Sequence, residues 1–453
     1  MKVKVEGSSK NKFRKKISYF YLIIVLIGSF LLFSPLTSKN GEIISFIDAF
    51  FISASAFSDT GLSPIITVDT INNFGQLIIL ILVQVGGMGV MTFKIILLLI
   101  VGKKINTTDR MLIFTEQNLT NHTGLVRLIK EVFIIIFACE LLFSLIIGLH
   151  MMFFYHYDCL KALWFGFFHA ISAINNAGFD LTGNSFINFS NDYLFQGYIM
   201  ILIIIGGLGF PILLDIKKFI IAKINKDHFK FSLFSRISIY TYFVITIIAF
   251  ILICLVDYQN LFINNNYLKG IFYSLFHVIS ARNAGFVTTD LSQFSQASQL
   301  IIAILMFIGA APASTGGGIR TTTFALIFLF LKTNLFNKND IEAYNRRIPK
   351  QTVYAAFITF SYAIFLVTLA TFVVVVFDPQ SRLIEAFFEV CSAFGTTGLT
   401  LDFTQDLNTV SKLVIALVMV IGQIGIANSL LLFTKDRDYT NNIRLPEENI
   451  TIG

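Results

Sequence analysis

Long apolar runs recur along almost the whole chain, and they constrain its fold more than any other feature of the sequence. An α-helix needs about 20 apolar residues to cross the hydrocarbon core of a bilayer. Eight runs approach or exceed this length: residues 17–33, 74–101, 126–154, 193–214, 234–256, 299–331, 353–377 and 413–433. With 55% hydrophobic and 13% charged residues, the chain is too apolar for a water-soluble protein. The sequence therefore predicts an all-α polytopic membrane protein with eight transmembrane helices.

Lysine and arginine collect in the N-terminal tail, residues 1–16, and in the segments 102–130, 215–236 and 332–350. Short loops that are rich in these residues stay on the cytoplasmic side of a membrane. The segments between them carry mostly aspartate and are predicted to lie outside, so both termini, including the tail of residues 435–453, are predicted to be cytoplasmic. The net charge of +7 then reflects membrane topology and does not indicate nucleic-acid binding.

A motif of small residues that ends in glycine occurs four times between the long runs. The copies are Ser55–Leu62, Ser172–Phe179, Ser280–Phe286 and Ser392–Leu399. Each copy ends a short apolar stretch, and these stretches are residues 45–58, 160–175, 268–282 and 383–395. They are too short to cross a bilayer and are predicted to re-enter it. Another glycine follows each motif 24 to 29 positions later, at Gly87, Gly207, Gly309 and Gly422.

This periodicity predicts four repeats of span, re-entrant half-span, glycine loop and span, at residues 17–101, 126–222, 234–332 and 353–434. Non-helical backbone at membrane depth is tolerated only where protein buries it or where it lines a water-filled path. We therefore expect the four re-entrant pore helices to converge around a pseudo-fourfold central pore. The alternative is that glycine with small neighbours marks close helix packing. That alternative explains a single motif well, but four motifs in register poorly.

Backbone carbonyls from several loops can replace the hydration shell of a cation, and glycine permits the dihedrals that turn them inward. The predicted selectivity-filter residues are Thr60, Gly61, Asn176, Ala177, Gly178, Asn283, Ala284, Gly285, Thr396, Thr397 and Gly398. Acidic residues near the glycines are predicted to concentrate cations as a funnel: Asp59, Asp180, Asp290 and Asp402. For Asp59, in the first filter segment, two alternatives stay open: a carboxylate beside the ion path that binds sodium, or one that points away.

The run of residues 299–331 contains Pro312 and the glycines 316–318 in its middle. Proline removes a backbone donor and three glycines favour open conformations, so a break in the helix is predicted at mid-depth. Such a break is a candidate gate beside a hydrated cavity. A packing kink remains an alternative. A phosphate-binding loop does not fit, because no strand precedes the segment and no lysine occupies the required place.

Several strings make the chain resemble the Trk/Ktr/HKT superfamily of potassium transporters over residues 17–433, with the greatest similarity to KtrB-type ion-translocating subunits. The strings are Asn175–Phe179, Ser280–Phe286, Gly86–Gly89, Gly206–Pro211 and Ala313–Thr323. The resemblance implies potassium uptake across a bacterial plasma membrane, a homodimer, and a separate cytoplasmic nucleotide-binding ring of the KtrA/TrkA type. It also implies an intramembrane gating loop, made here of Ala313, Ser314, Thr315, Gly316, Gly317, Gly318 and Arg320.

The chain departs from the family pattern at Gln423, because the family usually has a basic residue there that is proposed to form an electrostatic barrier beneath the filter. Asp59 is a second departure, since an uncharged residue is usual at its position. Arg282 is predicted to brace the third loop from behind, with Glu389, Glu385 or a helix C-terminus as its partner. His169 and His277 are predicted to be hydrogen-bonded residues of pore helices rather than metal ligands.

Other functions receive less support from the sequence. A sodium- or proton-coupled secondary transporter is the main alternative, although four loops of like orientation do not suit inverted repeats. Zinc-protease and nucleophile-elbow motifs are missing from the sequence, so an enzyme is not predicted. Potassium is the predicted substrate ion, sodium is a candidate stimulating ion, and no covalent cofactor is expected. The predicted cytoplasmic loops are about 20 residues long, so regulation is expected to come from a separate protein.

Overall fold

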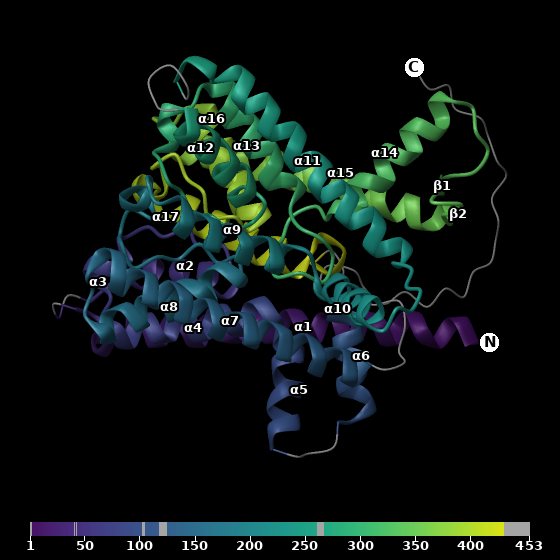
Figure 1. Cartoon of the computed structure of the whole chain (residues 1–453), viewed down its shortest axis with the longest axis horizontal. Coiled ribbons are helices and arrows are strands. Elements are labelled where there is room, and N and C mark those ends of the chain that lie inside the picture. Colours follow the sequence, from purple (N-terminus) through teal and green to yellow (C-terminus); the bar gives the residue numbers. More distant parts are fainter. Residues whose placement is uncertain are drawn as a thin grey trace.

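The computed structural model describes residues 2–39, 41, 43–101, 105–116, 125–260 and 267–429, and these residues form an almost entirely helical bundle (Figure 1). The predicted C-terminal tail, residues 435–453, lies outside the described residues. The predicted N-terminal tail is helical from residue 2 and is continuous with the first long helix.

The first part of the chain forms α1 (Lys2–Phe33), η1 (Pro35–Thr37), α2 (Phe46–Phe57), α3 (Thr67–Thr70), α4 (Asn73–Met88), α5 (Val90–Ile100) and α6 (Thr107–Glu116). It is followed by α7 (Leu125–Tyr155), α8 (Cys159–Ile174), η2 (Ile187–Phe189), α9 (Tyr193–Gly207) and α10 (Phe210–Ile224). The third part contains α11 (Leu233–Val256), α12 (Tyr267–Ser280), η4 (Leu291–Gln293), α13 (Gln296–Ile308), α14 (Thr321–Leu335) and the antiparallel strands β1 (Glu342–Ala343) and β2 (Arg346–Arg347). The last part forms α15 (Lys350–Phe377), α16 (Leu383–Gly395), η5 (Thr404–Asp406), α17 (Thr409–Ile424) and α18 (Ile426–Ser429).

Four of the described helices are long and apolar enough to cross a membrane: Lys15–Phe33 within α1, Val126–Tyr155 within α7, and the whole of α11 and α15. Two bent pairs, α4 with α5 and α9 with α10, raise the number to six if each pair is one crossing. The remaining predicted spans correspond to shorter apolar helices, α13, α14 and α17. Large apolar side chains on the outside of the long helices, such as Phe30, Phe153 and Phe372, are well exposed, as expected for a surface that faces lipid.

The predicted spans at residues 74–101 and 193–214 each contain a sharp bend, which was not predicted. The angle is 98° between α4 and α5 and 106° between α9 and α10. Each bend lies at a glycine with positive φ, Gly89 (84°) and Gly209 (89°), a conformation that L residues with side chains disfavour. After the first bend, α5 runs beside α6 away from the main bundle (Figure 1).

Four short helices, α2, α8, α12 and α16, lie within two residues of the four predicted half-spans. Each packs against the helix that follows it in its own part of the chain: α4, α9, α13 and α17, respectively. Each also packs against the corresponding helix of the preceding part: α2 on α17, α8 on α4, α12 on α9 and α16 on α13. These contacts close a ring in which the first and last parts of the chain are neighbours.

Candidate ion path and inner loop

The segments that follow the four short helices meet at the centre of this ring. We call residues 59–62, 176–179, 283–286 and 396–399 the ring segments. A Cβ atom added at each predicted filter glycine would meet a carbonyl oxygen of the next ring segment. The pairs are Gly61 with Ala177, Gly178 with Ala284, Gly285 with Thr397 and Gly398 with Thr60. The order closes on itself, so the four glycines lie in a ring and the four carbonyl groups lie beside them.

Each ring segment has the same backbone conformation. The residue two positions before the glycine has a positive φ, at Asp59 (52°), Asn176 (56°), Asn283 (101°) and Thr396 (50°). The glycine itself also has a positive φ, at Gly61 (91°), Gly178 (71°), Gly285 (76°) and Gly398 (93°). The first of these conformations ends the short helix, and the second redirects the chain beside the neighbouring segment.

The serine that begins each repeated motif holds its own ring segment in place. Ser55 Oγ accepts a hydrogen bond from Gly61 N, and Ser392 Oγ accepts one from Gly398 N, both at 3.0 Å. In the other two repeats the serine donates instead, Ser172 Oγ to Phe179 O (2.7 Å) and Ser280 Oγ to Phe286 O (2.6 Å). Sequence reasoning used these serines only to mark the motif and missed their role. Their recurrence five or six positions before the glycine was the available signal.

We call the side of the ring on which the segments continue into the loops of residues 180–192, 287–295 and 400–408 the outer side, and the opposite side the inner side. On the inner side lies the chain between α13 and α14, residues 309–320, which we call the inner loop. The predicted break in the run 299–331 is therefore present in the structure. It contains the gating-loop residues predicted from the resemblance.

The inner loop contacts three of the four ring segments. Gly317 N donates to Thr396 Oγ1 at 2.7 Å, and the side-chain amide of Asn176 lies 3.1 Å from Thr315 Oγ1. A Cβ atom at Gly316 would lie 2.5 Å from Asn283 Cγ, so only glycine fits there. The side chains of the positive-φ residues thus meet the loop directly beneath the ring.

Arg320 ties the inner loop to itself. Its guanidinium donates to the carbonyl oxygen of Gly316, to Ala311 O at 3.3 Å and to Ser314 Oγ at 3.4 Å. The loop is also fixed to the second bent pair, because Phe210 N donates to Ala313 O at 2.7 Å. Removal of Arg320 would take this donor from three acceptors at once, of which Ala311 O keeps a second hydrogen bond from Ser314 Oγ.

Gln423, at the predicted barrier position, lies beneath the ring and joins three parts of the chain. Its Nε2 atom is 3.3 Å from Asp59 Oδ2, 3.3 Å from Gly86 O and 3.2 Å from Thr315 O. Arg320, the basic residue of the inner loop, donates to carbonyl groups of its own loop and not to Gln423.

The four predicted funnel acids do not lie together. Asp59 is fully buried on the inner side, whereas Asp180, Asp290 and Asp402 lie in the outer loops. The prediction that Asp59 belongs to the funnel is therefore wrong, because its positive φ turns the side chain toward Gln423. Burial and the nearby Asp290 carboxylate raise the pKa of Asp402 above its usual range.

Arg282 is fully buried, and its guanidinium lies over the ring of Tyr242 at 5.0 Å. The predicted partners are wrong: Glu385 pairs with Arg382, and Glu389 accepts a hydrogen bond from Thr404. The guanidinium lies instead beside Tyr242 of α11.

The two histidines are hydrogen-bonded within their short helices, as predicted. His169 Nδ1 lies 2.8 Å from Phe165 O, and His277 Nδ1 lies 2.7 Å from Tyr273 O.

Glu140 was missed by sequence reasoning. It lies buried within α7, and its carboxylate accepts hydrogen bonds from Gln84 Nε2 (3.0 Å) and Asn175 Nδ2 (3.4 Å), next to the second ring segment. An acidic residue in the middle of the apolar run 126–154 was the available signal, because such residues are rare in membrane helices unless they have a partner or a function.

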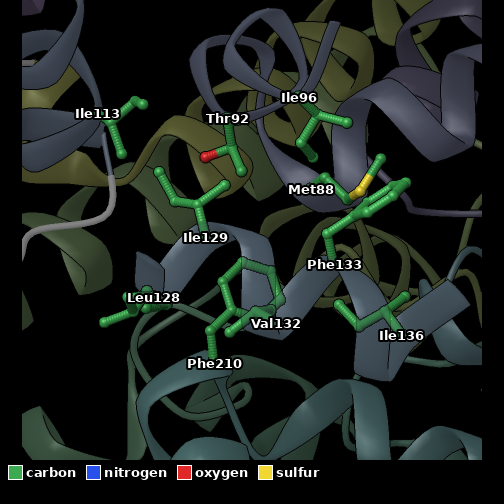
Figure 2. Close-up of a pocket in the computed structure, with 11 residues that line it drawn as sticks. Met88, Thr92, Ile96, Ile113, Leu128, Ile129, Val132, Phe133, Ile136 and Phe210 are labelled. Carbon is green, nitrogen blue, oxygen red and sulfur yellow. The ribbon is translucent and has the colours of Figure 1, made fainter. Parts of the chain in front are cut away.

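Two cavities differ in what they offer a cation. One, of about 600 Å³, lies below the inner loop and is lined by polar groups that include Glu116, Arg320 and Gln423. The other lies against α7 and is almost wholly apolar, with side chains such as Ile129, Phe133 and Ile136 pointing into it (Figure 2). The second cavity offers a cation little more than the hydroxyl oxygen of Thr92, whereas several polar groups line the first (Figure 2).

Comparisons with known proteins agree on one family. The family model "TrkH: Cation transport protein" matches residues 3–444. Ktr system potassium uptake protein D of Bacillus subtilis is 38% identical over 437 residues, covering 96% of each chain. Potassium/sodium uptake protein NtpJ of Enterococcus hirae is 33% identical and covers 98% of this chain and 99% of its own. Ktr system potassium uptake protein B of Bacillus subtilis is 32% identical, and the alignment covers 96% of this chain and 95% of that protein.

A solved structure has a similar fold. The potassium transporter TrkH from Vibrio parahaemolyticus superposes with a TM-score of 0.73 over 92% of this chain and 84% of that chain, at 19% identity. At this identity the likeness concerns the fold alone.

Proposed function

This chain belongs to the TrkH family of cation transport proteins, and we propose that it is the ion-translocating membrane subunit of a bacterial potassium uptake system. Relatives that align over almost the full length of the chain carry names of potassium uptake proteins. The protein is a membrane transporter and not an enzyme, as its family implies.

Selectivity comes from the ring segments. The observation that carries this proposal is the closed ring in which each glycine lies against the carbonyl group of the next segment. Carbonyl oxygens crowded around one axis replace the water of a potassium ion without a fixed charge. The short helices support the same assignment, since their C-terminal ends, where the helix dipole is negative, lie beside the ring.

Four repeats of two spans and one pore helix surround this axis, and the inner loop is the gate. The cyclic packing of α2, α8, α12 and α16 supports the fourfold arrangement. The contacts of the inner loop with three ring segments support the gate, because a loop in this position blocks the inner end of the path. Residues 17–101, 126–222, 234–332 and 353–434 form the repeats in this proposal, with eight crossings.

Both termini lie in the cytoplasm, and the subunit works as a homodimer with a cytoplasmic nucleotide-binding ring. The basic segments support this orientation, and two relatives are named as proteins of Ktr systems. The tail of residues 435–453 docks the ring. If deletion of Arg444–Gly453 leaves binding and activation by the partner intact, the tail has no such part.

Growth rescue tests the function directly. Bacteria that lack their own potassium uptake systems should grow at low potassium when they express the chain, and should accumulate rubidium-86. The experiment is run with and without sodium in the medium. A protein that reaches the membrane but supports neither growth nor rubidium uptake would contradict the proposal.

A sodium- or proton-coupled transporter is the second candidate. It is favoured by buried acids near the path, Asp59 and Glu140, and by the relative NtpJ, whose name includes sodium. In the rescue experiment, a coupled transporter requires sodium or an acidic medium for rubidium uptake, whereas a channel-like subunit does not.

A further inference from the structure

Three oxygen acceptors converge on one nitrogen at the inner side of the ring. Gln423 Nε2 lies 3.2 to 3.3 Å from Asp59 Oδ2, Gly86 O and Thr315 O. A primary amide has only two N–H donors, so it cannot direct one at each of three acceptors. All three distances are also long for a hydrogen bond between nitrogen and oxygen. The place occupied by Nε2 is therefore rich in oxygen.

Two further oxygens at this place have no partner. Within the described residues, neither Asp59 Oδ1 nor Gln423 Oε1 has a hydrogen-bond partner. Asp59 is fully buried, and the only donor that the described residues give its carboxylate is the amide of Gln423. An ionised carboxylate at membrane depth is costly unless a cation neutralises it.

An ion has a route to this place. The cavity of about 600 Å³ below the inner loop is lined by both Gly86 and Gln423. These oxygens also lie next to the ring, because Asp59 is two residues before the ring glycine Gly61.

We propose that Asp59, Gln423 and the carbonyl groups of Gly86 and Thr315 form a binding site for one dehydrated monovalent alkali cation. This site is separate from the carbonyl ring. It rests on the proposed function in that it lies on the same ion path. One carboxylate balances one positive charge, and rotation of the Gln423 amide by half a turn replaces its nitrogen with a fourth oxygen ligand. In the empty site the amide nitrogen faces the three oxygens that face the ion in the occupied site.

A purely structural role makes a different prediction. If Gln423 and Asp59 only join the repeats, Asp59→Asn keeps an acceptor for the amide and leaves cation binding unchanged. If they bind a cation, the same substitution removes the charge and the site. A lysine at position 423 would bring its own ammonium group to Asp59 and so exclude a free cation.

Calorimetric titration of the purified full-length protein tests the site, with KCl or NaCl added in a buffer of N-methyl-D-glucamine. The wild type should show two classes of site. Asp59→Asn and Gln423→Lys should each weaken one class by at least about tenfold, as expected for loss of a charged ligand or its neutralisation. Asp158→Asn, which removes an exposed acid, should leave both classes intact and serves as the matched control. Gly61→Ser should change the cation affinity of the other class of site, which Asp59→Asn leaves unchanged.

Two classes that persist unchanged in both Asp59→Asn and Gln423→Lys would overturn the proposal. Should Asp59→Asn fail to fold, Gln423→Lys alone decides, because it keeps Asp59. Crystals soaked in thallium provide a direct readout: an anomalous peak in contact with the Asp59 carboxylate supports the site, and a peak at the ring alone contradicts it. Failure here is distinct from failure of the proposed function, which would appear as absent rubidium uptake in the wild type.

Discussion

At the four ring glycines, both conformation and space exclude a side chain. Each has a positive φ, and a Cβ atom at any of them would press against a carbonyl oxygen of the next segment. The serine at the start of each motif then fixes the segment from behind, through a hydrogen bond of 2.6 to 3.0 Å. Small changes at these residues therefore shift the carbonyl groups themselves.

Gly61→Ser should reduce the preference for potassium over sodium. A side chain at this φ of 91° costs about 1–2 kcal/mol, and its Cβ would lie 2.5 Å from Ala177 O, so the neighbouring carbonyl must move. We expect the ratio of rubidium to sodium uptake to fall by about tenfold, which corresponds to about 1.4 kcal/mol. Isotope uptake in rescued cells measures the ratio.

Gly197→Ser is the control for this experiment. Gly197 lies in α9, and a Cβ atom there would have no neighbour within 4 Å, so selectivity should not change. An unchanged ratio in Gly61→Ser would refute the role of this glycine in the filter.

Asp402 should make uptake sensitive to external pH. Because burial and then Asp290 raise its pKa, Asp402 takes up a proton at a higher pH than an ordinary aspartate, and the outer mouth loses a negative charge as the pH falls. The apparent affinity for potassium should fall as the external pH is lowered, and the fall should begin at a higher pH than an ordinary aspartate would give. Asp402→Asn should have, at every pH, the low affinity that the wild type reaches in acidic medium. Its pH profile should therefore be flatter. Identical profiles for the two proteins would exclude this residue as the titrating group.

At the scale of the elements, the inner loop is the proposed gate. The loop is bonded to itself through Arg320 and to ring segments through Thr315 and Gly317. The loop also borders the bend after α9, because a Cβ atom at Gly209 would lie 2.7 Å from Pro312 O. In the proposed gate, opening therefore requires these contacts of the loop to break.

Deletion of Gly316–Gly318 should raise the flux of potassium even without a regulatory partner. The deletion removes the Gly317 N–H that binds Thr396 and the Gly316 carbonyl that binds Arg320. Flux is measured as rubidium-86 uptake into liposomes that contain the purified protein. A matched control replaces Arg346, which is exposed in the β1–β2 hairpin, with alanine and should not alter flux. A folded deletion variant with no flux would contradict the gate assignment.

The whole molecule depends on closure of the ring between its first and last parts. Lys412 of α17 and Asp48 of α2 form an ion pair of 2.7 Å across this junction, with only 15% and 17% of their side chains exposed. Such a pair is less screened by solvent than one on the surface, so it contributes more to holding the two parts together.

Asp48→Asn and Lys412→Met should each lower the melting temperature of the purified protein. The double variant should lose less unfolding free energy than the two single variants lose together. A coupling on the order of 1 kcal/mol is expected for a partly buried pair. The control pair Arg347–Asp340 is more exposed, at 66% and 37%, and should show little coupling. Strict additivity at Asp48 and Lys412 would show that the junction does not depend on this pair.

Local sequence determined the repeated parts of this protein. The apolar runs predicted membrane helices, and the short stretches predicted α2, α8, α12 and α16 to within two residues, because hydrophobic length and glycine conformation are local properties. The break before α14 was predicted for the same reason, from Pro312 and three glycines. The bends at Gly89 and Gly209 had a local signal in their glycine-rich strings, although it was not used.

Only the tertiary structure decided which side chains meet. Asp59 and Gln423 are 364 positions apart in sequence, and Arg282 faces Tyr242 rather than the predicted glutamates. The position of the inner loop against Asn176 and Thr396 likewise depends on how distant helices pack. Such contacts are set by the closed ring of helices, since the direction of a buried side chain depends on neighbours that the local sequence does not specify.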